Sequence, residues 1–226
     1  MAKETSSYVE FAEKFLEDQK DDNDELLFSF RGVLYPSRLC KAETFKALET
    51  MEARKDDVLI VAYPKCGTNW SQYIVNNMVA EIYKDCPPPN NFQLLEFGHP
   101  EKIKDINEWP SPRVFTTHLH YDNIPKSFFE NKVKIVVIFR NPKDTALKEN
   151  LYEGIKQIAE FYAFPLSEEK IKSLASKATF QGMSDRSSET HGSIAPIIFR
   201  KGEVGDWKTL FTEAQSQEMD AKFEEC

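Results

Sequence analysis

The sequence predicts an α/β domain built on a mainly parallel sheet, and three features support this. Two nearly continuous apolar runs, at 58–63 and 134–139, are typical of strands buried on both faces of a parallel sheet. Segments with helical spacing of apolar residues follow each run, at 69–83 and from Pro142 onward. A third, short strand is predicted at 113–117, so that strands and helices alternate along the chain.

The remaining elements follow in chain order. Helical spacing predicts helices over 8–19 and 42–51, with a short extended stretch over 28–34 between them. Three consecutive prolines predict a loop over 86–91. The helix after Pro142 is expected to end at Pro165, and Ser167 followed by two glutamates predicts the start of another helix. The polar segment 184–192 is expected to be a mobile loop.

Composition indicates one soluble domain over 1–226. The 226 residues are 41% hydrophobic and 29% charged, which suits a single globular core. The net charge of −8 argues against a general affinity for nucleic acid or anionic membrane. The apolar runs are far too short to span a bilayer. Because the four cysteines are scattered and no signal-peptide pattern is present, we expect reduced thiols, no metal site and a cytoplasmic location.

The segment 63–70, YPKCGTNW, lies between the first predicted buried strand and its helix. Backbone N–H groups of such a loop and of the first helical turn point toward the crevice beyond the strand. Gly67 permits a tight turn and Lys65 supplies positive charge, which together suit an anion site. The segment is not a Walker motif, because the lysine precedes the single glycine. An ordinary turn with an exposed lysine remains the alternative.

Two other strand ends carry candidate groups. His118 follows the strand at 113–117, where an imidazole can take a proton from an alcohol or phenol, although a lone histidine is more often structural. His120 is a weaker candidate. Arg140 follows the strand at 134–139 and offers a planar fork for a phosphate, unless it forms a surface salt bridge with Asp144. Further along, the cations and glycines of 200–205 suit a loop that wraps an anion.

Together these motifs resemble those of the cytosolic sulfotransferases. The segment 63–70 is similar to the family's 5'-phosphosulfate loop, with Cys66 in place of the usual serine, and RKGEVGDW at 200–207 is similar to its 3'-phosphate loop. The resemblance implies a P-loop NTPase-like three-layer sandwich. It also implies 3'-phosphoadenosine 5'-phosphosulfate (PAPS) as co-substrate, no metal, and transfer of a sulfuryl group to a hydroxyl or amine of a small acceptor. The segments around Phe28, Tyr35 and 118–125 resemble the 6B branch of the family.

The resemblance assigns roles to residues of this chain. Lys65 is expected to contact the bridging oxygen and the sulfuryl group, and His118 is expected to be the general base. Phe180 would stack on the adenine, although a core phenylalanine has the same pattern. The segment 208–217 resembles the family's short dimer segment, so a homodimer is implied. The cofactor-binding residues implied are Lys65, Cys66, Gly67, Thr68, Asn69, Trp70, Arg140, Thr179, Phe180, Met183, Phe199, Arg200, Lys201 and Gly202.

Departures from the family pattern concern single positions and one longer segment. Thr116 and Lys148 stand where the family usually has a lysine and a serine. After Arg140 the family has a long acceptor-side segment and a further strand that ends in a tyrosine and two acidic residues. Here 145–147 continues directly into 148–151, so we expect an internal deletion after residue 147 that removes one strand of the sheet.

The deletion would also remove a tyrosine that helps to hold the adenine and part of the acceptor pocket. We therefore expect low stability, with weak activity or none. The main alternative is a non-catalytic isoform that binds the nucleotide or a partner protein. A P-loop kinase is disfavoured, because the GxxxxGK order is absent.

Overall fold

The computed structural model describes residues 26–83, 94–139, 151–187 and 212–224. Its centre is a three-stranded parallel sheet in the order β4-β3-β5, which consists of β3 (Val58–Ala62), β4 (Val114–Thr117) and β5 (Lys134–Ile138). Val61 pairs with Thr117 on one side and with Val137 on the other. The three predicted strands are confirmed, and their carboxyl ends lie at one edge of the sheet.

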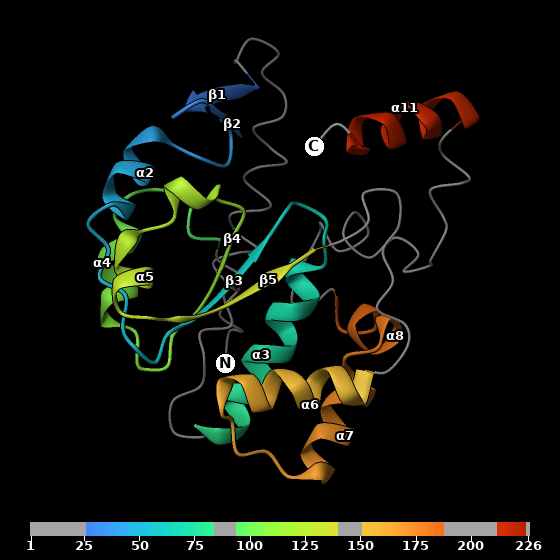
Figure 1. Cartoon of the computed structure of the whole chain (residues 1–226). Coiled ribbons are helices and arrows are strands. Elements are labelled where there is room, and N and C mark those ends of the chain that lie inside the picture. The colour runs from blue at the N-terminus through green and yellow to red at the C-terminus, as the bar shows by residue number, and fades with distance from the viewer. Residues whose placement is uncertain (1–25, 84–93, 140–150, 188–211, 225–226) are drawn as a thin grey trace.

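Helices cover both faces of this sheet, as Figure 1 shows. Leu59 of β3 packs into one apolar core, whereas its neighbours Val58 and Ile60 pack into the other. Because adjacent residues of a strand point to opposite faces, the continuous apolar run fills both layers. One layer contains α2 (Ala42–Leu48), α4 (Lys102–Glu108) and α5 (Lys126–Glu130), and the other contains α3 (Thr68–Ile82) and α6 (Leu151–Tyr162). The three-layer α/β fold is thereby confirmed.

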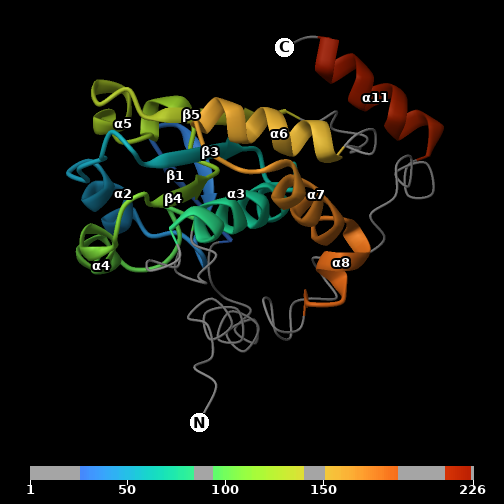
Figure 2. The same ribbon diagram turned by 90° about the horizontal axis from the view of Figure 1, so that it is seen from below.

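A second group of helices extends the layer of α3 and α6. Figure 2 shows α7 (Glu168–Lys177) beside both of them, followed by α8 (Phe180–Ser184). Ser167 caps α7 by accepting a hydrogen bond from the Lys170 N–H at 3.3 Å, so the predicted start of this helix is confirmed. Helix α6 ends before Pro165, because Ala163 takes a φ of 57° and the Phe164 N–H bonds back to the Ala159 carbonyl at 2.8 Å.

The N-terminal part differs from the prediction. The expected stretch over 28–34 is an antiparallel hairpin of β1 (Leu27–Phe30) and β2 (Val33–Pro36), turned by Arg31 and Gly32, whose φ values are 50° and 80°. Helix α2 ends at Leu48, earlier than predicted. The helix and loop predicted over 8–19 and 86–91 lie outside the described residues. The remaining described elements are the 3₁₀ helix η2 (Tyr121–Asn123) and α11 (Glu213–Glu224).

The predicted mobile loop over 184–192 is described only at its start. Ser184 is the last residue of α8, and the Ser187 hydroxyl donates to its carbonyl at 2.6 Å. Residues 188–192 lie outside the described part. Within the described ranges, no helix has both the length and the apolar character needed to cross a bilayer.

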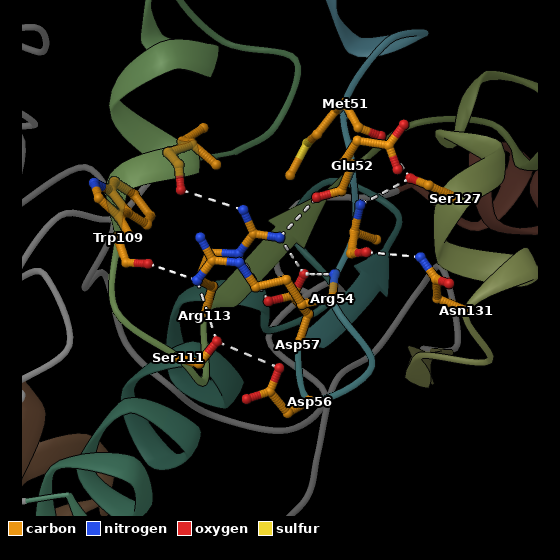
Figure 3. Close-up of polar contacts among 12 residues, drawn as sticks. Met51, Glu52, Arg54, Asp56, Asp57, Trp109, Ser111, Arg113, Ser127 and Asn131 are labelled. Atoms are coloured by element: carbon orange, nitrogen blue, oxygen red, sulfur yellow. Dashed lines mark hydrogen bonds and ion pairs between the residues drawn. The ribbon is translucent and has the colours of Figure 1, made fainter.

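A buried polar network fixes the amino end of β3 (Figure 3). Asp57 accepts hydrogen bonds from Arg113 Nε at 2.8 Å and Nη2 at 2.5 Å, and the two side chains are 0% and 1% exposed. Arg113 also donates to the Glu52 carbonyl at 2.9 Å. The Arg54 guanidinium donates to the Trp109 carbonyl at 2.7 Å and so ties the end of α4 to the same region. The sheet is therefore fixed at the end opposite to its candidate functional groups.

Candidate active site

The candidate groups converge where the parallel strands end. The loop 63–67 follows β3 and His118 follows β4. Thr117, the last residue of β4, pairs with Val61, the residue before the end of β3. Phe139 follows β5 at the same edge. Ligands of open α/β sheets bind at this edge, so the fold brings two predicted site segments to the expected place. Arg140, Phe199, Arg200, Lys201 and Gly202 lie outside the described residues, and their roles stay predictions.

The loop after β3 is tight and adopts an unusual backbone. The Cys66 N–H donates to the Tyr63 carbonyl at 3.1 Å. Lys65 has a φ of 69°, in a region that residues with a side chain rarely occupy, and its side chain is exposed. Gly67 has a φ of 100° at the start of α3, where glycine avoids the steric penalty. The turn therefore places a cation next to a helix start.

The first turn of α3 suits an anion. It contains no acidic residue, and Gly67 offers no side chain to cap its N–H groups. Such N–H groups lack acceptors within the helix and carry the positive end of its dipole. The Thr68 hydroxyl is buried and has no hydrogen-bond partner in the described structure. A buried donor without a partner is costly, so this hydroxyl is suited to a ligand oxygen.

His118 is oriented by the end of β3. Its Nδ1 lies 2.6 Å from the carbonyl oxygen of Ala62, three residues before Lys65. Because a carbonyl can only accept, Nδ1 carries a proton, so in the neutral form of the imidazole the lone pair is on Nε2. This tautomer is the one a general base needs. His120, in contrast, is a surface residue: its side chain is more than half exposed, and its Nδ1 lies 3.4 Å from Asp122 Oδ2.

A distant segment reaches the same loop through Trp70. Its indole N–H donates to the Ala178 carbonyl at 2.7 Å, just before the predicted adenine-side residues. Thr179 caps α8 by accepting from the Gly182 N–H at 3.1 Å. Met183 is buried, whereas Phe180 is 38% exposed. Phe180 is therefore partly exposed and is not a buried core residue.

An apolar groove lies beside β5. Its volume is about 250 Å³, and it extends from the start of α3 across the end of β5 to α6. Val137 and Phe139 are 49% and 89% exposed, although their sequence is typical of a strand buried on both faces. In the described part of the chain, β3 is the only strand that pairs with β5. The groove is lined by Ile60, Trp70, Ser71, Val75, Val136, Val137, Ile138, Phe139, Ile158 and Tyr162.

Sequence reasoning missed Glu96, which is 1% exposed and contacts the end of β4. Its carboxylate accepts the His118 N–H at 2.8 Å and the Thr117 hydroxyl at 2.7 Å. The one available signal was an acidic residue within the apolar segment 94–97. Within the described residues, no group of three or more His, Cys, Asp or Glu side chains is placed to hold a metal ion. The absence of a metal in the reaction stays a prediction.

Comparisons with known proteins identify the family to which this chain is similar. A family model described as Sulfotransferase domain matches residues 55–147 and 145–226. The chain is 41% identical to human Sulfotransferase 6B1 over 281 residues, which covers 98% of this chain and 93% of the relative. Since this chain has 226 residues, at least 55 of the 281 aligned positions have no counterpart in it.

Solved structures show the same fold. The crystal structure of mouse sulfotransferase SULT7A1 complexed with PAP matches with a TM-score of 0.74 at 21% identity, covering 89% of this chain and 94% of that chain. A structure of retinol dehydratase in complex with androsterone and inactive cofactor PAP matches with a TM-score of 0.60 at 16% identity, covering 85% and 88%.

Proposed function

The chain belongs to the sulfotransferase family, and from that premise we propose that it transfers a sulfuryl group from PAPS to a hydroxyl or amine of a small acceptor. The observation that carries this proposal is the 2.6 Å contact between His118 Nδ1 and the Ala62 carbonyl. It supports the role of His118 as base, because its imidazole lies beside the loop that holds Lys65 with Nδ1 as the donor. The solved relatives named with PAP support the choice of nucleotide.

The residues of the candidate site fit this co-substrate. Lys65, the Thr68 hydroxyl and the N–H groups of the first turn of α3 would hold its 5'-phosphosulfate. Thr179, Phe180 and Met183 would lie on the adenine side. Trp70, the last residue of the predicted 5'-phosphosulfate loop, donates to the Ala178 carbonyl just before them. By family resemblance, Arg140 and the segment 199–202 would hold the 3'-phosphate. The buried Thr68 hydroxyl without a partner is the structural feature that most directly supports this fit.

Positioning and charge would carry the catalysis. When bound, PAPS supplies the activated sulfuryl group. Charge in such a transfer spreads over the equatorial oxygens and the leaving phosphate, where fixed cations and N–H groups stabilise it. Lys65 supplies that charge at the bridging oxygen. His118 takes the acceptor proton at Nε2, while its Nδ1–H stays bonded to Ala62.

We also propose that an internal deletion makes this form a weak catalyst or a nucleotide-binding protein without turnover. The two segments matched by the family model meet at 145–147, shortly after β5. The aligned positions without a counterpart, together with the exposure of Val137 in β5 and of Phe139 just after it, support the loss of a neighbouring strand. Part of the acceptor pocket would be lost with it.

Nucleotide binding and turnover test these two proposals separately. We expect the full chain to bind 3'-phosphoadenosine 5'-phosphate in a calorimetric titration. Lys65→Met removes one charge-assisted contact of about 1.5–3 kcal/mol, so binding should weaken roughly 10- to 150-fold. Lys104→Met, an exposed lysine on α4, is the matched control and should bind as the wild type does. A folded chain that does not bind the nucleotide would contradict the assignment.

Turnover is measured with labelled PAPS and a panel of phenols, alcohols and amines. Sulfonation that His118→Ala abolishes supports the enzyme. Binding without sulfonation of any acceptor supports the non-catalytic isoform. Turnover as fast as that of the longer relatives would overturn the proposal that the deletion reduces catalytic activity.

Location and assembly complete the proposal. We place the protein in the cytoplasm, as the resemblance to cytosolic members implies, and cell fractionation tests this. The segment 208–217 supports a homodimer, and its described part begins at Thr212 and enters α11. Sedimentation of the purified chain distinguishes a monomer from a dimer.

A further inference from the structure

Glu96 is a buried acid to which the proposed function assigns no role. Acidic residues are almost never fully buried unless their charge is paired or hydrogen-bonded, because removing a carboxylate from water is costly. Both oxygens of Glu96 are used: Oε1 accepts the backbone N–H of His118, and Oε2 accepts the hydroxyl of Thr117. Its hydrogen bonds therefore end on two consecutive residues at the end of β4.

The position of these contacts is informative. The pairing of β3 with β4 ends at Val61 and Thr117, so His118 is the first residue beyond the ladder. Its N–H donates to Glu96, where a strand residue would donate to a neighbouring strand. The Thr117 hydroxyl also accepts the Leu119 N–H at 3.1 Å, which fixes the following residue. The carboxylate thus fixes the backbone of His118, one residue beyond the end of β4.

Glu96 is itself held in place. The Leu95 N–H donates to the Thr116 carbonyl at 3.0 Å, which attaches the segment to β4. The Lys102 ammonium donates to the Leu94 carbonyl at 2.9 Å and to the Phe97 carbonyl, on both sides of Glu96. Burial lowers the pKa of Lys102 to about 8, while the charge of Glu96 acts in the opposite direction. A cation near the acid therefore offsets part of the cost of its burial.

We propose that Glu96 is a positioning residue for His118: by binding the Thr117 hydroxyl and the His118 N–H, it keeps Nδ1 on the Ala62 carbonyl and leaves Nε2 as the base. Lys102 supports the segment that carries Glu96. The catalytic part of this inference rests on the function proposed for His118. The orientation of the imidazole does not, and it can be measured without any substrate.

Nitrogen-15 NMR of labelled imidazole tests the orientation directly, since Nδ1–H and Nε2–H tautomers differ in their nitrogen shifts. We expect wild-type His118 in its neutral form to be protonated at Nδ1. Glu96→Gln keeps the shape but leaves one acceptor oxygen for two donors, so the Nε2–H tautomer should become populated. Glu101→Gln, an exposed glutamate at the start of α4, is the matched control and should leave the tautomer unchanged.

A second variant keeps the test decisive if Glu96→Gln does not fold. Thr117→Val removes one donor to the carboxylate at nearly constant volume, and should shift the tautomer in the same direction but less. Folding of each variant is checked by near-ultraviolet circular dichroism. A folded Glu96→Gln protein with the wild-type tautomer overturns the inference, as does an unchanged tautomer in Thr117→Val when Glu96→Gln is unfolded.

Kinetics separate positioning from nucleotide binding. If the chain turns over, Glu96→Gln should lower kcat about tenfold to a hundredfold, as expected for a misplaced reacting group, with KM for PAPS nearly unchanged. An equal loss in nucleotide affinity would contradict a positioning role. If the chain neither binds nucleotide nor turns over, the proposed function fails, while the tautomer shift still decides the role of Glu96.

Discussion

Replacing Asp57 with asparagine should destabilise the protein far more than breaking a surface ion pair of the same length. Arg113 and Asp57 are 1% and 0% exposed and lie 2.5 Å apart. Removing one charge of a buried pair leaves the other uncompensated, which typically costs about 3–5 kcal/mol. Arg113 would keep its hydrogen bonds to the Ile106 and Glu52 carbonyls, at 3.3 and 2.9 Å. We therefore expect a loss of about 3 kcal/mol, at the lower end of that range.

The surface pair Arg31–Glu49 provides the control. Its atoms also lie 2.5 Å apart, but the side chains are 51% and 49% exposed. Exposed pairs contribute about 0–1 kcal/mol, so Glu49→Gln should change little. The two distances are equal, so the comparison reports the difference in burial together with the second hydrogen bond that Asp57 accepts from Arg113 Nε.

The assay is urea unfolding followed by tryptophan fluorescence, with the slope compared between variants to check that the transition stays two-state. A loss of about 3 kcal/mol is a large part of the roughly 5–15 kcal/mol that stabilises a domain. The double variant Asp57→Asn with Arg113→Met should lose less than the sum of the single losses, because the unpaired charge is gone. If Asp57→Asn costs no more than Glu49→Gln, the argument from burial is refuted.

Three further predictions concern other parts of the fold. The pKa of Lys102 is about 8 when folded and 10.5 when unfolded, so the unfolded chain binds more protons between these values and the Lys102 contribution to stability rises with pH. Urea unfolding at pH 8 and pH 9 should show a rise in the wild type relative to Lys102→Met. The unfolded Cys40 thiol, with a pKa of 9.0, also titrates in this range, but it is present in both proteins. Equal changes in the two proteins would contradict the low pKa of Lys102. Gly182→Ala places a Cβ 2.8 Å from the Lys177 carbonyl oxygen and should lower Tm. Gly154→Ala in α6 adds a Cβ in open space and should increase the free energy of unfolding by about 0.5–1 kcal/mol. A rise in Tm for both variants would show that a Cβ fits at position 182. Val137→Lys should reduce self-association, measured by light scattering, because a charge blocks an exposed strand edge. Leu34→Lys on the N-terminal hairpin is the control and should not reduce it. The same reduction in both variants would indicate a general gain in solubility instead.

The local pattern of the sequence was sufficient where an element is determined by its own residues. The apolar run of β3 predicted a strand buried on both faces, and Ser167 predicted the start of α7 through its hydroxyl. The order of strand, loop and helix placed Lys65 and His118 at the same edge of a parallel sheet, where the structure has them. The likeness to sulfotransferases, which rested on short motifs with departures such as Cys66, was confirmed.

Other features depend on contacts that no local pattern contains. Glu96 and His118 are 22 residues apart, and nothing near Glu96 in the sequence identifies its partner. The turn at Arg31 requires a positive φ at a residue with a side chain, which local propensity disfavours. Helix α5 has only five residues, too few to show a helical period, and neither it nor α4 was predicted. The exposure of Phe180 could be decided only by the packing of α8.

The hydrogen bond from Trp70 to Ala178 has a consequence for how one nucleotide is recognised. It joins the helix that would meet the sulfated end of the ligand to the segment that would meet its base. When one of these two protein segments becomes ordered on binding its part of the ligand, the entropic cost of ordering the other segment falls. The binding of the two ends of one nucleotide is therefore positively coupled. We expect adenosine and inorganic pyrophosphate, added together, to bind more tightly than each does alone, and Trp70→Phe to abolish that synergy.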